Sequence, residues 1–129
     1  MNISLKGRPE KKLNDKLTAI EDIIDFLKDK EDDLTVEDLK DVVVRIPKTI
    51  RAELPEQGEG FLFDAQLGKV FALSPSAVFI FSRIQEGKTL GSIIKEMMQS
   101  FDVDKDVILN DVQDFIYQLR EFGLGADHD

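Results

Sequence analysis

Cysteine is absent from the 129-residue chain, and histidine occurs once, as His128. The lack of cysteine excludes disulfide bonds, thiolate metal sites and a cysteine nucleophile, and it is typical of a reducing compartment. His128 lies in a polar tail, which cannot hold a catalytic group in a fixed geometry. No apolar run approaches the roughly 20 residues that cross a bilayer, and the opening segment lacks the apolar core of a secretory signal. We therefore expect a cytoplasmic protein with no membrane partner.

Positive charge is also scarce. The chain has 17 basic and 26 acidic residues, a net charge of -9. Residues 1–41 hold 8 basic and 12 acidic side chains, and residues 42–129 hold 9 and 14, so neither part is basic. Nucleic-acid binders usually present a positive surface, because phosphate neutralisation supplies most non-specific affinity. The charge therefore makes a DNA-binding winged helix the least favoured reading, and no nucleic-acid partner is expected.

Two short motifs suggest ligand chemistry, and both are incomplete. Residues 102–113 place aspartates at the first three ligand spacings of an EF-hand loop, but Val107 and Gln113 stand where glycine and glutamate are required. The run from Gly87 to Thr89 matches the end of a phosphate-binding loop, but Ser82 replaces the glycine needed five residues earlier. With no catalytic constellation in the sequence, we predict a protein that is not an enzyme and uses no cofactor or metal.

The N-terminal part has a helical pattern. Apolar residues recur at steps of three and four, which places them on one face of a helix predicted over residues 14–30. The members of this stripe are Leu13, Leu17, Ile20, Ile23, Ile24 and Leu27. A short second helix is predicted after Thr35, a suitable N-cap residue. The stripe is short for an autonomous coiled coil, so we expect it to pack on its own domain, on a second copy or on a partner.

The rest of the chain alternates strand and turn signals and then becomes helical. Strands are predicted at "TIRAEL", "FLFD" and "KVFAL", and helices over 75–85, 89–101 and 105–122. Ser74 followed by Pro75 is a strong helix start, and Gly87 suits a helix end. The prediction is an α+β fold: a winged-helix-like domain of three antiparallel strands followed by three helices, with a helical extension. The predicted units are residues 1–41, 42–125 and a tail, 126–129.

Residues 42–125 resemble the PqqD-like family, the peptide-recognition domains of pathways that make ribosomal, post-translationally modified peptides. The resemblance rests on an ordered set: the lead-in "VVVRIPKTIRAEL", the hairpin and helix "GEGFLFDAQLGKVFALSPSAVFIFSRIQEGKTLGSII", and the terminal "LREFGLG". Ser74 stands where the family usually has asparagine. Serine and asparagine are about equally good as helix caps. Phe81 stands in place of a tryptophan and still supplies a large aromatic side chain.

The resemblance implies a non-catalytic peptide chaperone. A precursor's leader peptide would add as a strand to residues 69–73, in a groove against the third helix, and be delivered to a modifying enzyme, often of the radical type. An unpaired strand edge supports such β-augmentation physically. Alternation places Phe71 and Leu73 toward the core, with Val70 and Ala72 on the opposite face. The expected peptide-binding residues are Lys69, Val70, Phe71, Ala72, Leu73, Ile108, Asp111, Val112, Phe115 and Leu119.

Several alternatives stay open. For each apolar residue of the third helix, plain core packing is as good an explanation as a place in the groove wall. A homodimeric scaffold, which pairs its strand edge with its own extension or with its twin, competes with peptide delivery. The extension would either pack within the protein, mediate a dimer, or cover the strand edge at residues 69–73 and gate peptide binding.

Overall fold

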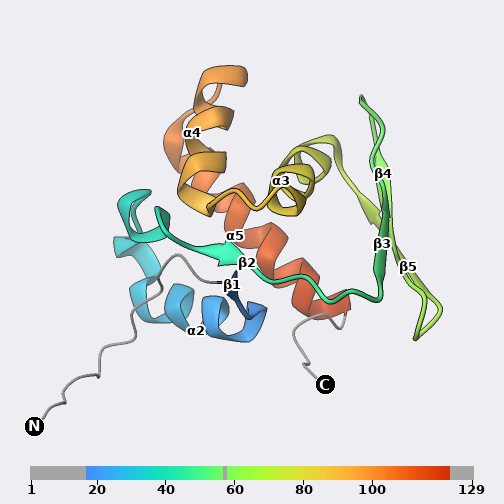
Figure 1. The fold of residues 1–129 in the computed structure, drawn as a ribbon. Helices are drawn as coiled ribbons and strands as arrows, with labels where there is room; N and C mark the ends of the chain where they lie inside the picture. Colours follow the sequence, from blue (N-terminus) through green and yellow to red (C-terminus); the bar gives the residue numbers. More distant parts are fainter. Residues whose placement is uncertain (1–16, 57, 123–129) are drawn as a thin grey trace, which may run out of the picture.

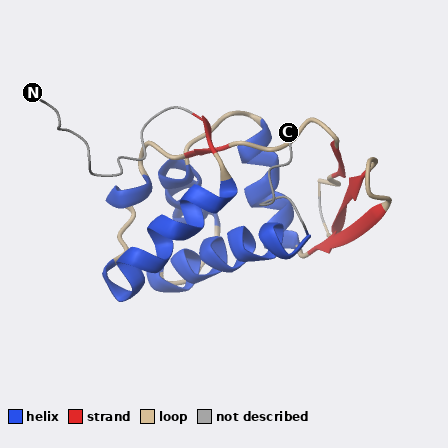
Figure 2. Cartoon of the chain, turned by 90° about the horizontal axis from the view of Figure 1, so that it is seen from below, coloured by secondary structure: helices blue, strands red, loops and turns tan. Residues whose placement is uncertain are grey.

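The fold separates a group of helices from a small sheet at one end of the molecule. The computed structural model describes residues 17–56 and 58–122. Figures 1 and 2 show the helices gathered on one side and strands β3, β4 and β5 on the other, with α5 between α2 and the sheet. The arrangement confirms the predicted α+β fold, in which three antiparallel strands precede three helices.

The sheet has the order β3-β4-β5 and is antiparallel throughout. Its strands are β3 (Ile50–Glu53), β4 (Gly60–Asp64) and β5 (Lys69–Leu73). The β4–β5 turn forms because Gly68 adopts φ +70° and because the Asp64 carboxylate accepts hydrogen bonds from the backbone N–H groups of Gln66 and Leu67, at 2.9 and 3.2 Å. The two strands of this hairpin are as predicted.

The three following helices are α3 (Pro75–Gln85), α4 (Leu90–Ser100) and α5 (Lys105–Phe122). The Ser74 hydroxyl accepts a hydrogen bond from the N–H of Ala77 at 3.2 Å, and the Thr89 hydroxyl accepts one from the N–H of Ser92 at 3.1 Å. Gly87 adopts φ +83° just after α3. These caps fix where β5 stops and where α3 and α4 start, and the three helices lie within one residue of the bounds predicted from the sequence.

The N-terminal prediction needs a correction. Helix α2 spans Ile20–Lys30, whereas Leu17–Thr18 form strand β1, which pairs in parallel with β2 (Val43–Val44). Ala19 is extended, with ψ 147°, and Leu17 is 62% exposed, so the apolar stripe joins the core only from Ile20. The helical spacing of Leu17 was therefore misleading, because pairing with β2 determines its conformation. Leu13 and residues 14–16 lie outside the described residues, as does the tail.

Two turns of 3₁₀ helix connect α2 to β2. They are η1 (Glu31–Asp33) and η2 (Glu37–Leu39). The short helix predicted after Thr35 is the three-residue 3₁₀ turn η2, whose N-cap is Val36 rather than Thr35. Thr35 precedes that position, and its hydroxyl accepts from the N–H of Asp38 at 3.2 Å, while the Asp38 carboxylate accepts from the N–H of Thr35 at 2.9 Å. A Cβ on Gly91 would lie 2.6 Å from the Cα of Lys40, so α4 packs directly on this connection.

The hydrophobic core is one continuous cluster. It includes Ile20, Ile23, Ile24 and Leu27 from α2 together with the buried side chains of α3, α4 and α5. Helix α2 packs against α5, at the far side of that helix from the sheet (Figure 1). The extension therefore packs within the protein, one of the arrangements expected from its apolar stripe, and its described part does not cover β5.

Candidate functional site

Strand β5 has a free edge, because β4 occupies its other side and no further described strand pairs with it. The Gly68 N–H donates to the carbonyl of Asp64 at 2.7 Å, and the Ala65 N–H donates to the carbonyl of Thr49 at 3.2 Å. These bonds set the alternation of the ladder: Lys69, Phe71 and Leu73 direct their backbone groups toward β4. The N–H and C=O groups of Val70 and Ala72 therefore point outward from the sheet edge.

The side chains of β5 alternate as predicted. Leu73 is buried, and the half-buried ring of Phe71 lies 5.2 Å from the ring of Phe122 at the end of α5. Val70 and Ala72 are exposed on the opposite face. The Phe71–Phe122 contact brings the C-terminal end of α5 close to the middle of β5, so a strand added to β5 would run beside α5.

A small cavity of about 130 Å³ continues this edge beyond Leu73, between the start of α3 and the side of α5. Its walls combine hydroxyl, apolar, amide and carboxylate groups. The lining residues are Ser74, Ser76, Ala77, Ile80, Asp111, Asp114, Phe115 and Gln118. Ser74 follows β5 directly in the chain, which places the cavity at the end of the free strand edge.

The expected groove residues of α5 divide into two groups. Asp111 and Phe115 border the cavity, whereas Ile108, Val112 and Leu119 are buried in the core. Sequence reasoning missed Asp114, Gln118 and Phe122 as neighbours of the β5 edge. They follow Asp111 at helical spacing, on a stripe rotated from the buried one, and the sequence does not say which stripe faces the sheet.

Within the described part of the chain, the carboxylates of this cavity have no basic neighbour. Among the described residues, Asp111 and Asp114 take part in no ion pair or hydrogen bond through their side chains, and no basic residue lines the cavity. Asp114 is exposed and Asp111 is half-buried. The α5 side of the candidate site is therefore acidic, and the apolar residues that line it, Ala77, Ile80 and Phe115, are almost wholly buried.

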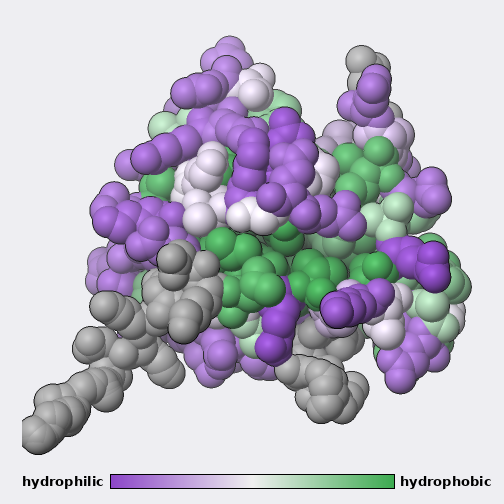
Figure 3. Space-filling view, viewed as in Figure 1, coloured by the Kyte–Doolittle hydropathy of each residue, from purple (hydrophilic) through white to green (hydrophobic). Residues whose placement is uncertain are grey.

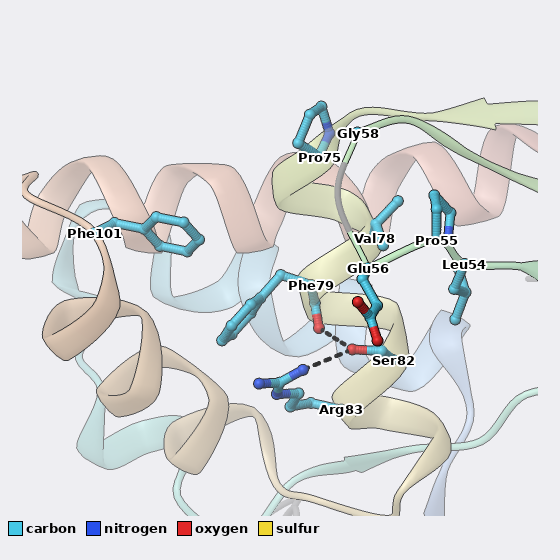
Figure 4. A pocket seen from close by; sticks show the side chains of 10 residues that line it. All are labelled: Leu54, Pro55, Glu56, Gly58, Pro75, Val78, Phe79, Ser82, Arg83 and Phe101. Atoms are coloured by element: carbon cyan, nitrogen blue, oxygen red, sulfur yellow. Dashed lines mark hydrogen bonds between the residues drawn. The ribbon is translucent and has the colours of Figure 1, made fainter.

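A larger cavity, about 460 Å³, opens on another side of α3, against the β3–β4 connection (Figure 4). Phe79 and Phe101 line it with their rings 5.3 Å apart, and the Arg83 guanidinium lies 3.9 Å from the centre of the Phe79 ring. The Nε of Arg83 donates to Glu96 at 2.9 Å. Since Arg83 already has these partners, this wall is a packed cation–π and ion-pair cluster.

The outer face of the sheet is unusually apolar. Phe61 is 46% exposed and Phe63 is 40% exposed, and their cross-strand neighbours on this face are Ala72 and Val70. Figure 3 shows hydrophobic surface over the strands at the right of the molecule. Residues next to the β5 edge are thus apolar on the outer side and acidic on the α5 side.

The described residues contain no cluster of three or more His, Cys, Asp or Glu side chains able to hold a metal ion. Within the same ranges, none of the helices has the length and apolar character needed to cross a membrane.

Comparisons with known proteins agree with this geometry. The family model "Coenzyme PQQ synthesis protein D (PqqD)" matches residues 59–124, which is more than half of the chain. A solved structure described as "TbiB1 in Complex with the TbiA(beta) Leader Peptide" has the same fold, with a TM-score of 0.58 and 24% identity over 67% of this chain and 100% of that one. A search of curated proteins found no significant match. The extent of the family match, together with the hairpin and three helices that it covers, shows that this chain belongs to the PqqD family.

Proposed function

We propose that this protein binds the leader peptide of a precursor peptide and delivers it to a modifying enzyme, without catalysis of its own. The peptide adds as a strand to β5, with its backbone paired to Val70 and Ala72 and its side chains directed toward α5. Family membership supports this proposal, as does the shared fold with TbiB1, whose solved structure contains a leader peptide.

The observation that carries the proposal is the free edge of β5 beside a groove-forming helix. Unpaired N–H and C=O groups on an edge strand are satisfied by an added strand, and pockets for alternate side chains give specificity. Residues 69–73 contain no proline, which would remove a donor from the ladder. The cavity between α3 and α5 supplies a pocket next to this edge.

The scaffold alternative uses the same edge differently, because it pairs β5 with the protein's own extension or with a twin. The described part of the extension lies on α5 and β2, away from β5, which favours an edge that is available to another chain. A homodimer, a radical-type enzyme partner and a cytoplasmic location belong to the proposal as further expectations.

The test is a titration of ¹⁵N-labelled protein with a synthetic peptide that copies the leader of a short precursor gene adjacent to this one. We expect amide shifts along residues 69–73 and on the sheet-facing side of α5. Shifts confined to other surfaces, or no shifts at a millimolar peptide concentration, would refute peptide binding at this edge. Delivery is tested separately, by comparing modification of the precursor with and without this protein.

A further inference from the structure

The sheet has a second free edge, on strand β3, which the proposed function leaves unused. In the described part of the chain, β4 pairs with one side of β3 and no strand pairs with the other. The Ala65 N–H donates to the carbonyl of Thr49, so the alternation of this ladder directs the N–H and C=O groups of Ala52 outward from the edge. An edge with such unpaired groups can accept a further strand.

The outer face of β3 carries two exposed side chains of opposite charge, Arg51 and Glu53. Their cross-strand neighbours on β4 are Phe63 and Phe61, so neither charge meets another charge across the existing ladder. Among the described residues, neither of the two takes part in an ion pair. A basic and an acidic residue two positions apart on one strand are complementary to the same strand of a second copy that runs antiparallel to it.

The charges and the outward backbone groups select one register for such a pair. With Ala52 opposite Ala52 of the second copy, the two residues exchange their outward N–H and C=O groups. Arg51 then lies opposite Glu53 on both sides of the two-fold axis, at non-hydrogen-bonded positions, where side chains approach most closely. A shift by two residues would set Arg51 against Arg51 or Glu53 against Glu53, and a shift by one residue would bring opposite faces of the strands together.

We propose that two copies of this protein associate through their β3 edges in this register, so that the two three-stranded sheets form one antiparallel sheet. Each copy keeps its β5 edge at an outer end of the joint sheet, so the inference is independent of peptide binding. On the face toward the helices, Ile50 lies opposite Leu54 of the second copy, which adds apolar contact. The paired segment, residues 50–54, is far smaller than the roughly 800 Å² per partner of a stable interface, so we expect a weak, concentration-dependent dimer.

The experiment measures self-association of the full-length protein by sedimentation velocity, from micromolar to millimolar concentration. The variants Arg51→Glu and Glu53→Arg each place like charges opposite one another on both sides of the axis. A mixture of the two variants restores opposite charges at both places, because one copy carries two acidic and the other two basic residues. The control variants Lys28→Glu and Asp25→Arg make the same changes of net charge at exposed positions on α2.

We expect the native chain to dimerise, and each β3 variant alone to associate about tenfold more weakly or worse, because two attractive pairs become repulsive. The mixture of the two β3 variants should form a heterodimer with about the native affinity, and the control variants should stay within about twofold of it. In ¹⁵N spectra of the native chain, the amide of Ala52 should shift with protein concentration, whereas the amides of Val70 and Ala72 should not.

A native chain that stays monomeric at millimolar concentration would overturn the inference and leave the proposed function intact. A mixture of the β3 variants that associates no better than each variant alone would also overturn it, as would an equal loss of association in the control variants. Concentration-dependent shifts at Val70 and Ala72, with none at Ala52, would place the second copy on β5, and this result would overturn the inference in favour of the scaffold alternative.

Discussion

Glu96 connects two helices through a single carboxylate. Its two oxygens accept hydrogen bonds from Arg83 Nε at 2.9 Å and from Lys88 Nζ at 2.6 Å, and both donors belong to α3 or the turn after it. The hydrogen bond from Lys88, and to a smaller extent the one from Arg83, lowers the pKa of the Glu96 carboxyl below its usual 4.5. The ionised form is therefore favoured by folding, and the α3–α4 contact depends on pH.

The sign of that dependence follows from linkage. Since folding lowers this pKa, the stabilisation is complete above pH 4.5 and is lost as the pH falls through the folded-state value. We expect Glu96→Gln to reduce the free energy of unfolding by about 0.5–1 kcal/mol at pH 7, the usual range for partly exposed pairs. Urea denaturation of both proteins at pH 7 and pH 3 measures the difference. If Glu96→Gln lowered the free energy of unfolding equally at both pH values, the role of the charge would be contradicted. The control variant is Glu59→Gln, at an exposed loop position.

Local chemistry was readable from the sequence, and longer-range pairing was not. The caps at Ser74 and Thr89 and the positive φ of Gly68 follow from residue type and immediate neighbours. The Arg83–Glu96 pair depends on how α3 and α4 cross, which no local pattern specifies. Likewise the spacing of α5 correctly marked an apolar stripe, but whether Ile108 or Asp114 would lie at the sheet edge depended on the rotation of the helix.

At the scale of elements, α2 forms part of the main core although it precedes the residues that the family model matches. Its stripe was predicted from its spacing, but its start was not, because Leu17 and Thr18 pair with Val43 and Val44 across a long sequence separation. Leu27 of α2 and Tyr117 of α5 line the same surface hollow, so the two helices share a boundary. The division of the chain at residue 41 stays a prediction.

The packing of α2 makes a stability prediction. Ile24 is completely buried, so Ile24→Ala should lower the free energy of unfolding by about 2–4 kcal/mol through lost burial and a residual cavity. Because the core is continuous, circular dichroism and the fluorescence of Tyr117, the sole tyrosine, should report one shared urea transition in this variant. Asp25→Ala, at the exposed neighbouring position, should change stability by less than about 0.5 kcal/mol. If Tyr117 fluorescence kept the wild-type midpoint while part of the circular dichroism signal was lost at a lower urea concentration, α2 would be an independent unit.

For the molecule as a whole, the decisive feature is that its two free sheet edges differ. Strand β3 ends the sheet on one side and β5 on the other. Strand β5 contacts the end of α5, through Phe71 and Phe122, and leads into the cavity between α3 and α5. The same ladder alternation directs the N–H of Ala72 outward from β5 and the N–H of Ala52 outward from β3. Each edge therefore has an alanine with an outward N–H group; the Ala72 side chain is exposed, whereas that of Ala52 is half-buried against the core.

Affinity for the leader peptide in the variants Ala72→Pro and Ala52→Pro tests the strand-addition account most directly. Proline at an outward-facing edge position removes a free donor without breaking the existing ladder, so amide spectra should show that both variants remain folded. We expect Ala72→Pro to weaken binding about tenfold or more, because a peptide carbonyl loses its partner and the ring obstructs approach. Ala52→Pro should leave the affinity within about twofold of the native value. Unchanged binding by a folded Ala72→Pro variant would contradict peptide addition to β5.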